Sequence, residues 1–300
     1  MNLIRIFFLA SLVILSVSCT TNQPPAEKPS DEFSFAFMTD IHVQREKNAI
    51  NGFRQAITKV NELNPAFVIT GGDLVMDCLG QSYGRADSLY HIYTTMQKEF
   101  KMPVFNTIGN HEHYGWYVLK GTDTIHPEYG KKMFEKRIGP RYQRIDRFGW
   151  VFLLLDSVVK DSTGGYEGGI DPEQIQWLKE QLAMLAAETP IVISLHIPLL
   201  TTEAQILRGA TAANEPGEVV VNSKEVLDLF KGHNLKLVLQ GHLHYYETLH
   251  VFGTDFVTGG SVAAAWWEGP YLETEEGFLL LKVKGKEVSW EYIDYGWKVE

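Results

Sequence analysis

Short runs of residues that are apolar on both faces constrain the fold of this chain more than any other feature. The clearest reads WVFLLLD over residues 150–156, and PAFVITGGD at 65–73 is another short buried run. The stretch FSFAFMTD at 33–40 alternates instead, and the alternation breaks at Asp40. A strand that is apolar on both faces belongs to a sheet covered on both sides. Between the runs, 48–64 and 171–188 carry apolar residues at helical spacing. This alternation predicts an α/β fold.

The chain is long enough for one large domain, because it has 300 residues of which 45% are hydrophobic. After residue 246 the helical pattern stops. The stretches 247–260, 276–285 and 286–296 are predicted to be antiparallel strands, the last two joined by a tight Lys-Gly-Lys turn. The sequence contains no internal repeat and no linker between domains. We therefore expect residues 33–300 to form a single domain.

The N-terminus has the features of an export signal. Arg5 precedes an apolar run from Ile6 to Val17 that is too short to span a membrane comfortably. The run ends at Ser18-Cys19, which resembles a bacterial lipoprotein signal in which Cys19 carries the lipid. We expect a signal peptide at 1–18, a flexible tether at 19–32 and a lipid-anchored protein of the periplasm or cell surface. The alternative is an ordinary secretory peptide with an incidental cysteine.

The charge balance restricts the partners of the chain. Its formal net charge of −10 argues against a general nucleic-acid binder, which would display a basic surface. A local positive site remains compatible with this charge, because a bound metal ion is often the largest charge in a pocket. Cys78 is the one cysteine in the body of the chain, so no internal disulfide is expected.

Polar side chains of the types that bind metals follow five of the predicted strands. Singly, each could be a helix cap or a turn residue. Because ligands bind at strand ends in open α/β sheets, and several of these positions have glycine beside them, their joint occurrence indicates a site. They are Asp40 and His42, Asp73, Asn110 and His111, His196, and His242 and His244.

In this order the motifs D-x-H, G-D, G-N-H-E, H and G-H-x-H resemble those of the calcineurin-like metallophosphoesterases, over roughly residues 33–260. The resemblance implies a four-layer α/β/β/α sandwich of two mixed sheets and a centre of two divalent metal ions. By that resemblance Asp40, His42 and His244 would hold one ion, Asp73 would bridge, and Asn110, His196 and His242 would hold the other. Mixed oxygen and nitrogen ligands suit manganese, iron or zinc better than calcium.

The resemblance also implies a reaction, the hydrolysis of a phosphate ester by a hydroxide held between the two ions. His111 would protonate the leaving oxygen without binding metal. Met76 stands where purple acid phosphatases have tyrosine, and Asp77 lies one position beyond the aspartate that supports the histidine in protein phosphatases. The phosphate-binding arginine of that branch is missing, which favours diesters. A phosphomonoesterase or nucleotidase, and a non-catalytic metal-holding surface protein, are the alternatives.

Four residues are candidates for contact with a phosphate-ester substrate. Tyr114 and Trp116 open an aromatic and basic insertion at 113–144, Arg208 lies in the polar loop 201–218, and Trp267 belongs to a tryptophan pair with Trp266. Aromatic rings there could stack on a base or sugar, and arginine could bind phosphate oxygens. The alternative is that these aromatics pack in the core and that the arginine has no special role.

Overall fold

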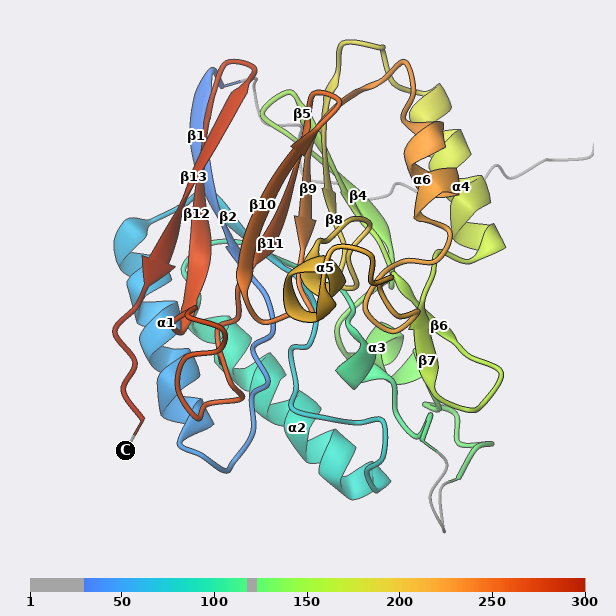
Figure 1. Ribbon diagram of the computed structural model, residues 1–300. Helices are drawn as coiled ribbons and strands as arrows, with labels where there is room; N and C mark the ends of the chain where they lie inside the picture. The colour runs from blue at the N-terminus through green and yellow to red at the C-terminus, as the bar shows by residue number, and fades with distance from the viewer. Residues whose placement is uncertain (1–29, 118–122, 300) are drawn as a thin grey trace, which may run out of the picture.

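The computed structural model of the protein describes residues 30–117 and 123–299. Two large mixed sheets lie at its centre (Figure 1). The first has five strands in the order β13-β12-β1-β2-β3, with bounds Glu287–Asp294, Gly277–Lys284, Glu32–Met38, Phe67–Thr70 and Val104–Asn106. The strands β1, β2 and β3 are parallel, whereas β12 and β13 pair antiparallel.

The second sheet has six strands in the order β10-β11-β9-β8-β5-β4. Their bounds are Tyr246–Val251, Thr254–Gly259, Asn234–Gln240, Pro190–Ser194, Trp150–Leu154 and Gln143–Arg147. The four inner strands are parallel to one another, and the two edge strands pair antiparallel. A small separate pair is formed by β6 at Val158–Lys160 and β7 at Tyr166–Gly168.

Helices cover the outer face of each large sheet (Figure 1). On the five-stranded sheet these are α1 at Ala49–Leu63 and α2 at Tyr83–Met96, and on the six-stranded sheet α4 at Pro172–Ala183 and α6 at Ser223–Leu229. The short helices α3 at Lys132–Arg137 and α5 at Glu203–Arg208 lie in connections. Single 3-10 turns occur at Gln97–Glu99 and Asn110–Glu112.

The alternation of side chains along β1 shows why the sheets and helices form four layers. Phe33, Phe35 and Phe37 point into an apolar cluster shared with the second sheet. Ala36 and Met38 point the other way, into the cluster under α1 and α2. A third cluster lies between the second sheet and α4 and α6. The predicted α/β/β/α sandwich of two mixed sheets is confirmed.

The C-terminal strands differ from the sequence prediction in their pairing. Strand β10 lies at the edge of the sheet, and β11 lies between β10 and β9. Strand β11 therefore pairs with both neighbours, antiparallel with β10 and parallel with β9. The β12–β13 hairpin joins the first sheet, beside β1. An apolar-polar pattern identifies a strand but not its neighbour. The predicted antiparallel pairing is confirmed for β10 with β11 and for β12 with β13, whereas the stretch 247–260 forms two strands and the parallel pairing of β11 with β9 was not predicted.

Within the described residues, no helix combines the length and the apolar character that crossing a membrane requires. The predicted signal peptide, Cys19 and the tether up to residue 29 lie outside those residues.

Candidate metal centre

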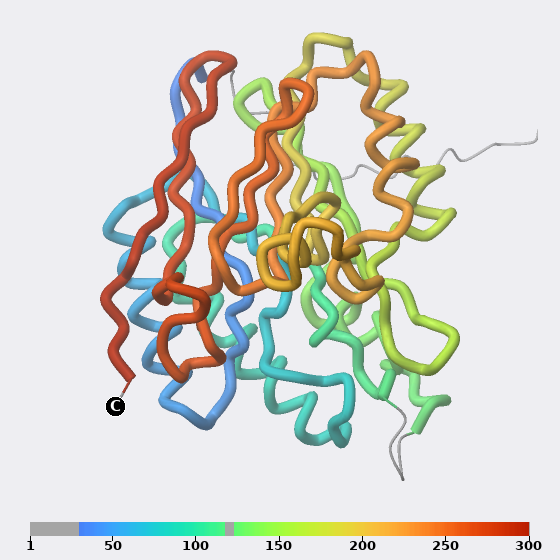
Figure 2. The backbone as a smooth tube through the Cα atoms, in the orientation of Figure 1, coloured from blue at the N-terminus to red at the C-terminus, as the bar shows by residue number. Residues whose placement is uncertain are grey.

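The turns that follow the parallel strands lie together at one end of both sheets (Figure 2). Backbone hydrogen bonds hold these turns against one another, from Asp40 N–H to Gly72 O and from Gly241 N–H to His196 O, both at 3.0 Å. Two further contacts join the turns of one sheet to those of the other, from His196 Nδ1 to Gly71 O at 2.8 Å and from His242 N–H to Asp40 Oδ2 at 3.0 Å. All the strand-end residues that the sequence singled out converge here.

The carboxylate and imidazole groups form two adjoining sets that could each hold a metal ion. Asp40, His42 and His244 make one set, and Asp73, His196 and His242 make the other. Asn110 joins the second set, because its Oδ1 lies 2.9 Å from Nε2 of His196.

Asp73 occupies the position between the two sets. Its Oδ2 lies 3.6 Å from Nε2 of His42 and 3.2 Å from Nε2 of His196. Its Oδ1 accepts the backbone N–H of His111 at 3.0 Å, which fixes the orientation of the carboxylate. One carboxylate can thus face both sets at once, as a bridge between two cations requires.

Five of these residues have backbone in the left-handed region, which non-glycine residues rarely adopt. The φ angles are 54° at Asp40, 45° at His42, 51° at Asp73, 74° at His242 and 61° at His244. Such conformations cost energy and persist where the surrounding structure holds them, typically at functional sites. Neighbouring glycines make room for the convergence, since a Cβ on Gly109 would overlap Asp73 and one on Gly241 would overlap Thr39.

Backbone carbonyls determine which nitrogen of three histidines faces the centre. In each case one ring N–H donates to a carbonyl, so that the other nitrogen presents its lone pair inward in the neutral ring. The contacts are His196 Nδ1 to Gly71 O at 2.8 Å, His242 Nε2 to Gly217 O at 2.9 Å and His244 Nδ1 to Ala264 O at 2.6 Å. The sequence could not indicate them, because every residue has a carbonyl.

The donor set fits divalent ions. Nε2 of His42 and Nε2 of His244 lie 3.0 Å apart. Nε2 of His244 carries a lone pair in the neutral ring, because its Nδ1–H donates to Ala264 O. Among the residues that the structure describes, Nδ1 of the buried His42 has no hydrogen-bond partner. If that Nδ1 carries the His42 proton, the two facing nitrogens repel unless a cation lies beside both. The first set can therefore bind a cation through two imidazoles and one carboxylate.

The electrostatics keep the carboxylates ionised. Burial raises the pKa of Asp40, but His244 and His196 outweigh burial and lower it to about 2. Burial likewise opposes ionisation of Asp73, yet His196 and His111 hold its pKa well below the usual range. Burial lowers the pKa of His196, but Asp73 and Asp40 raise it to about 9. In the metal-free protein His196 therefore carries a proton that an incoming ion would displace.

Glu112 supports the centre, a role that the sequence did not reveal. Its buried carboxylate accepts four backbone N–H groups, those of Leu74 and Val75 at Oε1 and those of Asp73 and Gly109 at Oε2, over 2.7–3.2 Å. Burial and Asp73 raise the pKa of Glu112, whereas the N–H donors lower it. Because two N–H groups point at each oxygen, a proton on either oxygen would face a donor, so these contacts favour the ionised form. The side chain ties the turn after β2 to the turn after β3.

His111 lies beside the centre with part of its side chain open to solvent, 22% exposed. Its Nδ1 donates to the carbonyl of Met76, so Nε2 faces Asp73, whose Oδ2 is 3.7 Å away. Asp77 is a second neighbour of Nδ1 of His111, with its Oδ1 3.9 Å from that nitrogen. His42, Asp73 and His111 also form a third possible metal-binding group.

Three of the four residues expected to contact a substrate are buried, and each packs against other parts of the protein. Tyr114 packs in the cluster under α1 and α2, and Trp116 contacts His113 with ring centroids 4.0 Å apart and ring planes tilted by 37°. Trp267 lies over Gly52, and its Nε1–H donates to His42 O at 3.1 Å. Trp267 therefore packs against the turn that carries the ligand candidate His42.

Arg208 and Trp266 are accessible. Arg208 pairs with Glu215 and Glu218 at 3.4 and 2.9 Å, so its guanidinium is already engaged by carboxylates. Trp266 is half-buried, and its ring centroid lies 4.5 Å from that of His244. Both tryptophans of the pair have left-handed backbone, so neither is in a strand. Trp266, and not Trp267, is the one that adjoins the centre.

Comparison with known proteins agrees with this geometry. A 3',5'-cyclic adenosine monophosphate phosphodiesterase, CpdA of Haemophilus influenzae, is 27% identical over 73% of this chain and 72% of its own length. A "Probable cyclic nucleotide phosphodiesterase" of Psychrobacter arcticus is 28% identical over 66% of this chain, and the match spans 62% of that protein's length.

Among solved structures, a dimetal phosphatase of Danio rerio has the same fold. The TM-score is 0.60 at 15% identity, covering 88% of this chain and 99% of that one. The family model described as Calcineurin-like phosphoesterase matches residues 33–246. The chain therefore belongs to the calcineurin-like phosphoesterase family.

Proposed function

We propose that the protein is a metal-dependent phosphodiesterase whose centre holds two divalent ions of manganese, iron or zinc. The position of Asp73 carries this proposal, because one ionised carboxylate faces two complete sets of ligands. Ions bound there would supply a water molecule of lowered pKa and would offset the negative charge of the phosphoryl oxygens.

His111 acts as the general acid in this proposal. Its Nδ1–H remains bonded to the carbonyl of Met76, so the ring presents Nε2 toward the substrate side of Asp73. A proton carried at Nε2 passes to the oxygen of the leaving alcohol. A positioned acid of this kind typically contributes about 10²–10⁴ in rate.

The substrate class proposed is a phosphodiester, with cyclic nucleotides as the first candidates. Two observations support it: two relatives bear the name of cyclic nucleotide phosphodiesterases, and the chain lacks the arginine expected beside a phosphomonoester dianion. A phosphomonoesterase or nucleotidase is the alternative within the family.

The test is a comparison of three esters with one metal-stripped preparation, before and after manganese, zinc or iron is restored. The esters are bis-p-nitrophenyl phosphate, p-nitrophenyl phosphate and 3′,5′-cyclic AMP. We expect turnover that depends on restored metal and favours the diesters. Faster hydrolysis of the monoester would move the assignment to a phosphomonoesterase. Metal binding without turnover of any ester would contradict an enzymatic role and favour a metal-holding binding protein.

We also propose that the protein is exported and anchored to a bacterial membrane through a lipid on Cys19. The support is the sequence alone, an apolar run of twelve residues followed by Ser18-Cys19 and a proline-containing tether. Expression of the full chain in a bacterium should place it in the membrane fraction, and Cys19→Ala should release it. Recovery of both forms in the soluble fraction would contradict the anchor.

A further inference from the structure

The half-buried Trp266 lies beside the first set of ligands, outside the apolar core. Its ring centroid is 4.5 Å from that of His244 and 6.2 Å from that of His42. Trp266 belongs to none of the three apolar clusters. In the part of the chain that the structure describes, its indole Nε1–H also has no hydrogen-bond partner. Core packing and hydrogen bonding therefore do not account for the position of this side chain.

The backbone on either side of Trp266 is bonded to the ligand residues. Ala264 O accepts Nδ1–H of His244 at 2.6 Å, and Nε1–H of Trp267 donates to His42 O at 3.1 Å. Trp266 itself has a left-handed backbone, with φ at 52°. Such a conformation is costly for a bulky residue and persists where the surrounding structure holds it, typically at functional sites. The indole is thus held in one place relative to the first set.

Tyr271 supports the indole at its edge. The two ring centroids lie 6.1 Å apart with the ring planes at 72°, an edge-to-face arrangement that aromatic pairs favour. The backbone of Tyr271 is fixed in turn, because it exchanges two hydrogen bonds with that of Thr274, at 2.9 and 2.8 Å. Trp266 is therefore a preorganised aromatic surface at the centre.

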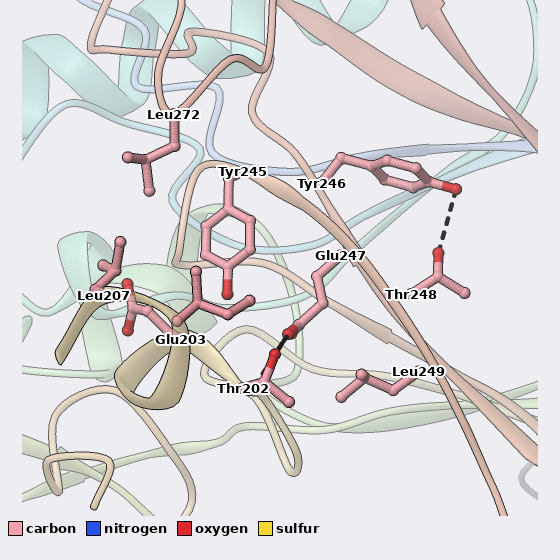
Figure 3. A pocket seen from close by; sticks show the side chains of 10 residues that line it. Thr202, Glu203, Leu207, Tyr245, Tyr246, Glu247, Thr248, Leu249 and Leu272 are labelled. Atoms are coloured by element: carbon pink, nitrogen blue, oxygen red, sulfur yellow. Dashed lines mark hydrogen bonds between the residues drawn. The ribbon is translucent and has the colours of Figure 1, made fainter. Parts of the chain in front are cut away.

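Two other aromatic residues near the ligands have an explanation in the packing. Tyr166 has its ring centroid 6.1 Å from that of His242, but it packs against the apolar cluster under α4 and α6. Tyr245 follows His244 in the chain, yet Figure 3 shows its side chain lining the cavity between α5 and β10. None of the residues that line this cavity belongs to a ligand set. Trp266 is the aromatic residue that adjoins the ligands without such a role.

The proposed acid and the indole are both neighbours of His42. The ring centroid of His111 lies 4.8 Å from that of His42, and the centroid of Trp266 lies 6.2 Å from it. A diester whose leaving oxygen meets His111 can therefore extend to Trp266. A tryptophan ring offers a flat surface for stacking, and nucleobases stack on aromatic side chains whatever their hydrogen-bonding pattern.

We propose that Trp266 stacks on the base of a nucleotide diester held at the centre and thereby determines the preference for nucleotide substrates. The proposal rests on the proposed function, because it concerns the substrate of the same site. The rival role for Trp266 is to shield His244 from solvent. A shield would act on the metal ions and on every substrate alike, whereas a stacking surface acts only on substrates that carry a base.

The kinetic test compares 3′,5′-cyclic AMP with the 3,5-cyclic phosphate of 1-deoxyribofuranose, which has the same diester and no base. The full-length, metal-loaded protein is used, and metal content is measured in each variant. Trp266→Ala should lower kcat/KM for cyclic AMP about tenfold or more, the usual effect of losing one base-stacking ring. It should leave kcat/KM for the base-free ester within about twofold. Trp266→Phe keeps an aromatic face and should restore most of the activity on cyclic AMP.

A binding measurement gives a readout that needs no turnover. Cyclic AMP is titrated calorimetrically into metal-loaded His111→Ala and into the same variant carrying Trp266→Ala, so that the ester is not consumed. We expect Kd to rise about tenfold or more with the second substitution. Trp290→Ala is the matched control, because Trp290 is another half-buried tryptophan, on β13, and donates to Tyr246. This substitution should leave Kd within about twofold.

Three results would overturn the proposal. They are equal losses on the two cyclic esters, loss of metal from Trp266→Ala, and an affinity for cyclic AMP that is absent or does not change with Trp266→Ala. None of them is the failure of the proposed function, which the metal-dependent hydrolysis of bis-p-nitrophenyl phosphate by the wild-type protein tests separately.

Discussion

Replacing Glu112 by glutamine tests whether this buried carboxylate holds the metal-binding turns together. The substitution keeps the size of the side chain but turns one oxygen into an NH₂ group. Two of the four backbone N–H groups that Glu112 accepts then lose their acceptor and face a donor. At about 1–1.5 kcal/mol for each lost hydrogen bond, with a further cost for the buried unsatisfied donors, we expect a loss of about 3 kcal/mol or more.

The assay is urea unfolding of the metal-stripped protein, so that bound ions do not mask the difference in free energy. Glu268→Gln is the matched control, because Glu268 makes an exposed ion pair with Lys47, and such pairs contribute less than about 1 kcal/mol. We also expect weaker metal binding in Glu112→Gln, since Asp73 depends on the same contacts. A free energy of unfolding within about 0.5 kcal/mol of wild type would refute the reasoning.

Two further predictions concern the metal ligands. Asp73→Asn should reduce the metal content of the purified protein from two ions per chain to one or none, because a neutral amide cannot offset the repulsion between two cations. Atomic emission measures the metal content, and two ions per chain in the variant would contradict the bridging role. Metal affinity should rise as the pH rises to about 9, because below that pH the ion must displace a proton from His196, whose pKa is raised by Asp73 and Asp40. Chelator competition between about pH 7 and pH 8 measures this, and an affinity independent of pH would contradict it.

Local patterns in the sequence predicted the α/β alternation and the polar residues at strand ends, whereas the four layers and the roles of those residues were implied by the family resemblance. Runs such as that at 150–156 are apolar on both faces, and this property alone requires a covered sheet. The ligand residues follow strands directly, so the edge where parallel strands end brings them together. The short segments that link them, such as Gly71-Gly72-Asp73, leave little freedom in where each side chain lies.

Other features depend on long-range contacts that no local pattern encodes. Helix α2 buries Tyr90 and Tyr93, whose hydroxyls donate to Glu112 O and Asn106 Oδ1. Because these buried side chains end in polar hydroxyls, the sequence of α2 does not show a clear apolar face. The burial of Trp267 follows from a glycine on α1, far away in the chain. The carbonyls that orient His196, His242 and His244 carry no residue-type signal at all.

In the proposed mechanism seven residues hold the ions, and His111 is free to act as the acid. The most direct test measures metal content and turnover together in His111→Ala, with 3′,5′-cyclic AMP as an ester whose leaving group needs a proton. We expect the wild-type metal content with turnover reduced about 10²–10⁴-fold. Loss of metal from the variant would show instead that His111 is itself a ligand beside His42 and Asp73. Turnover at the wild-type rate would show that His111 is not the acid.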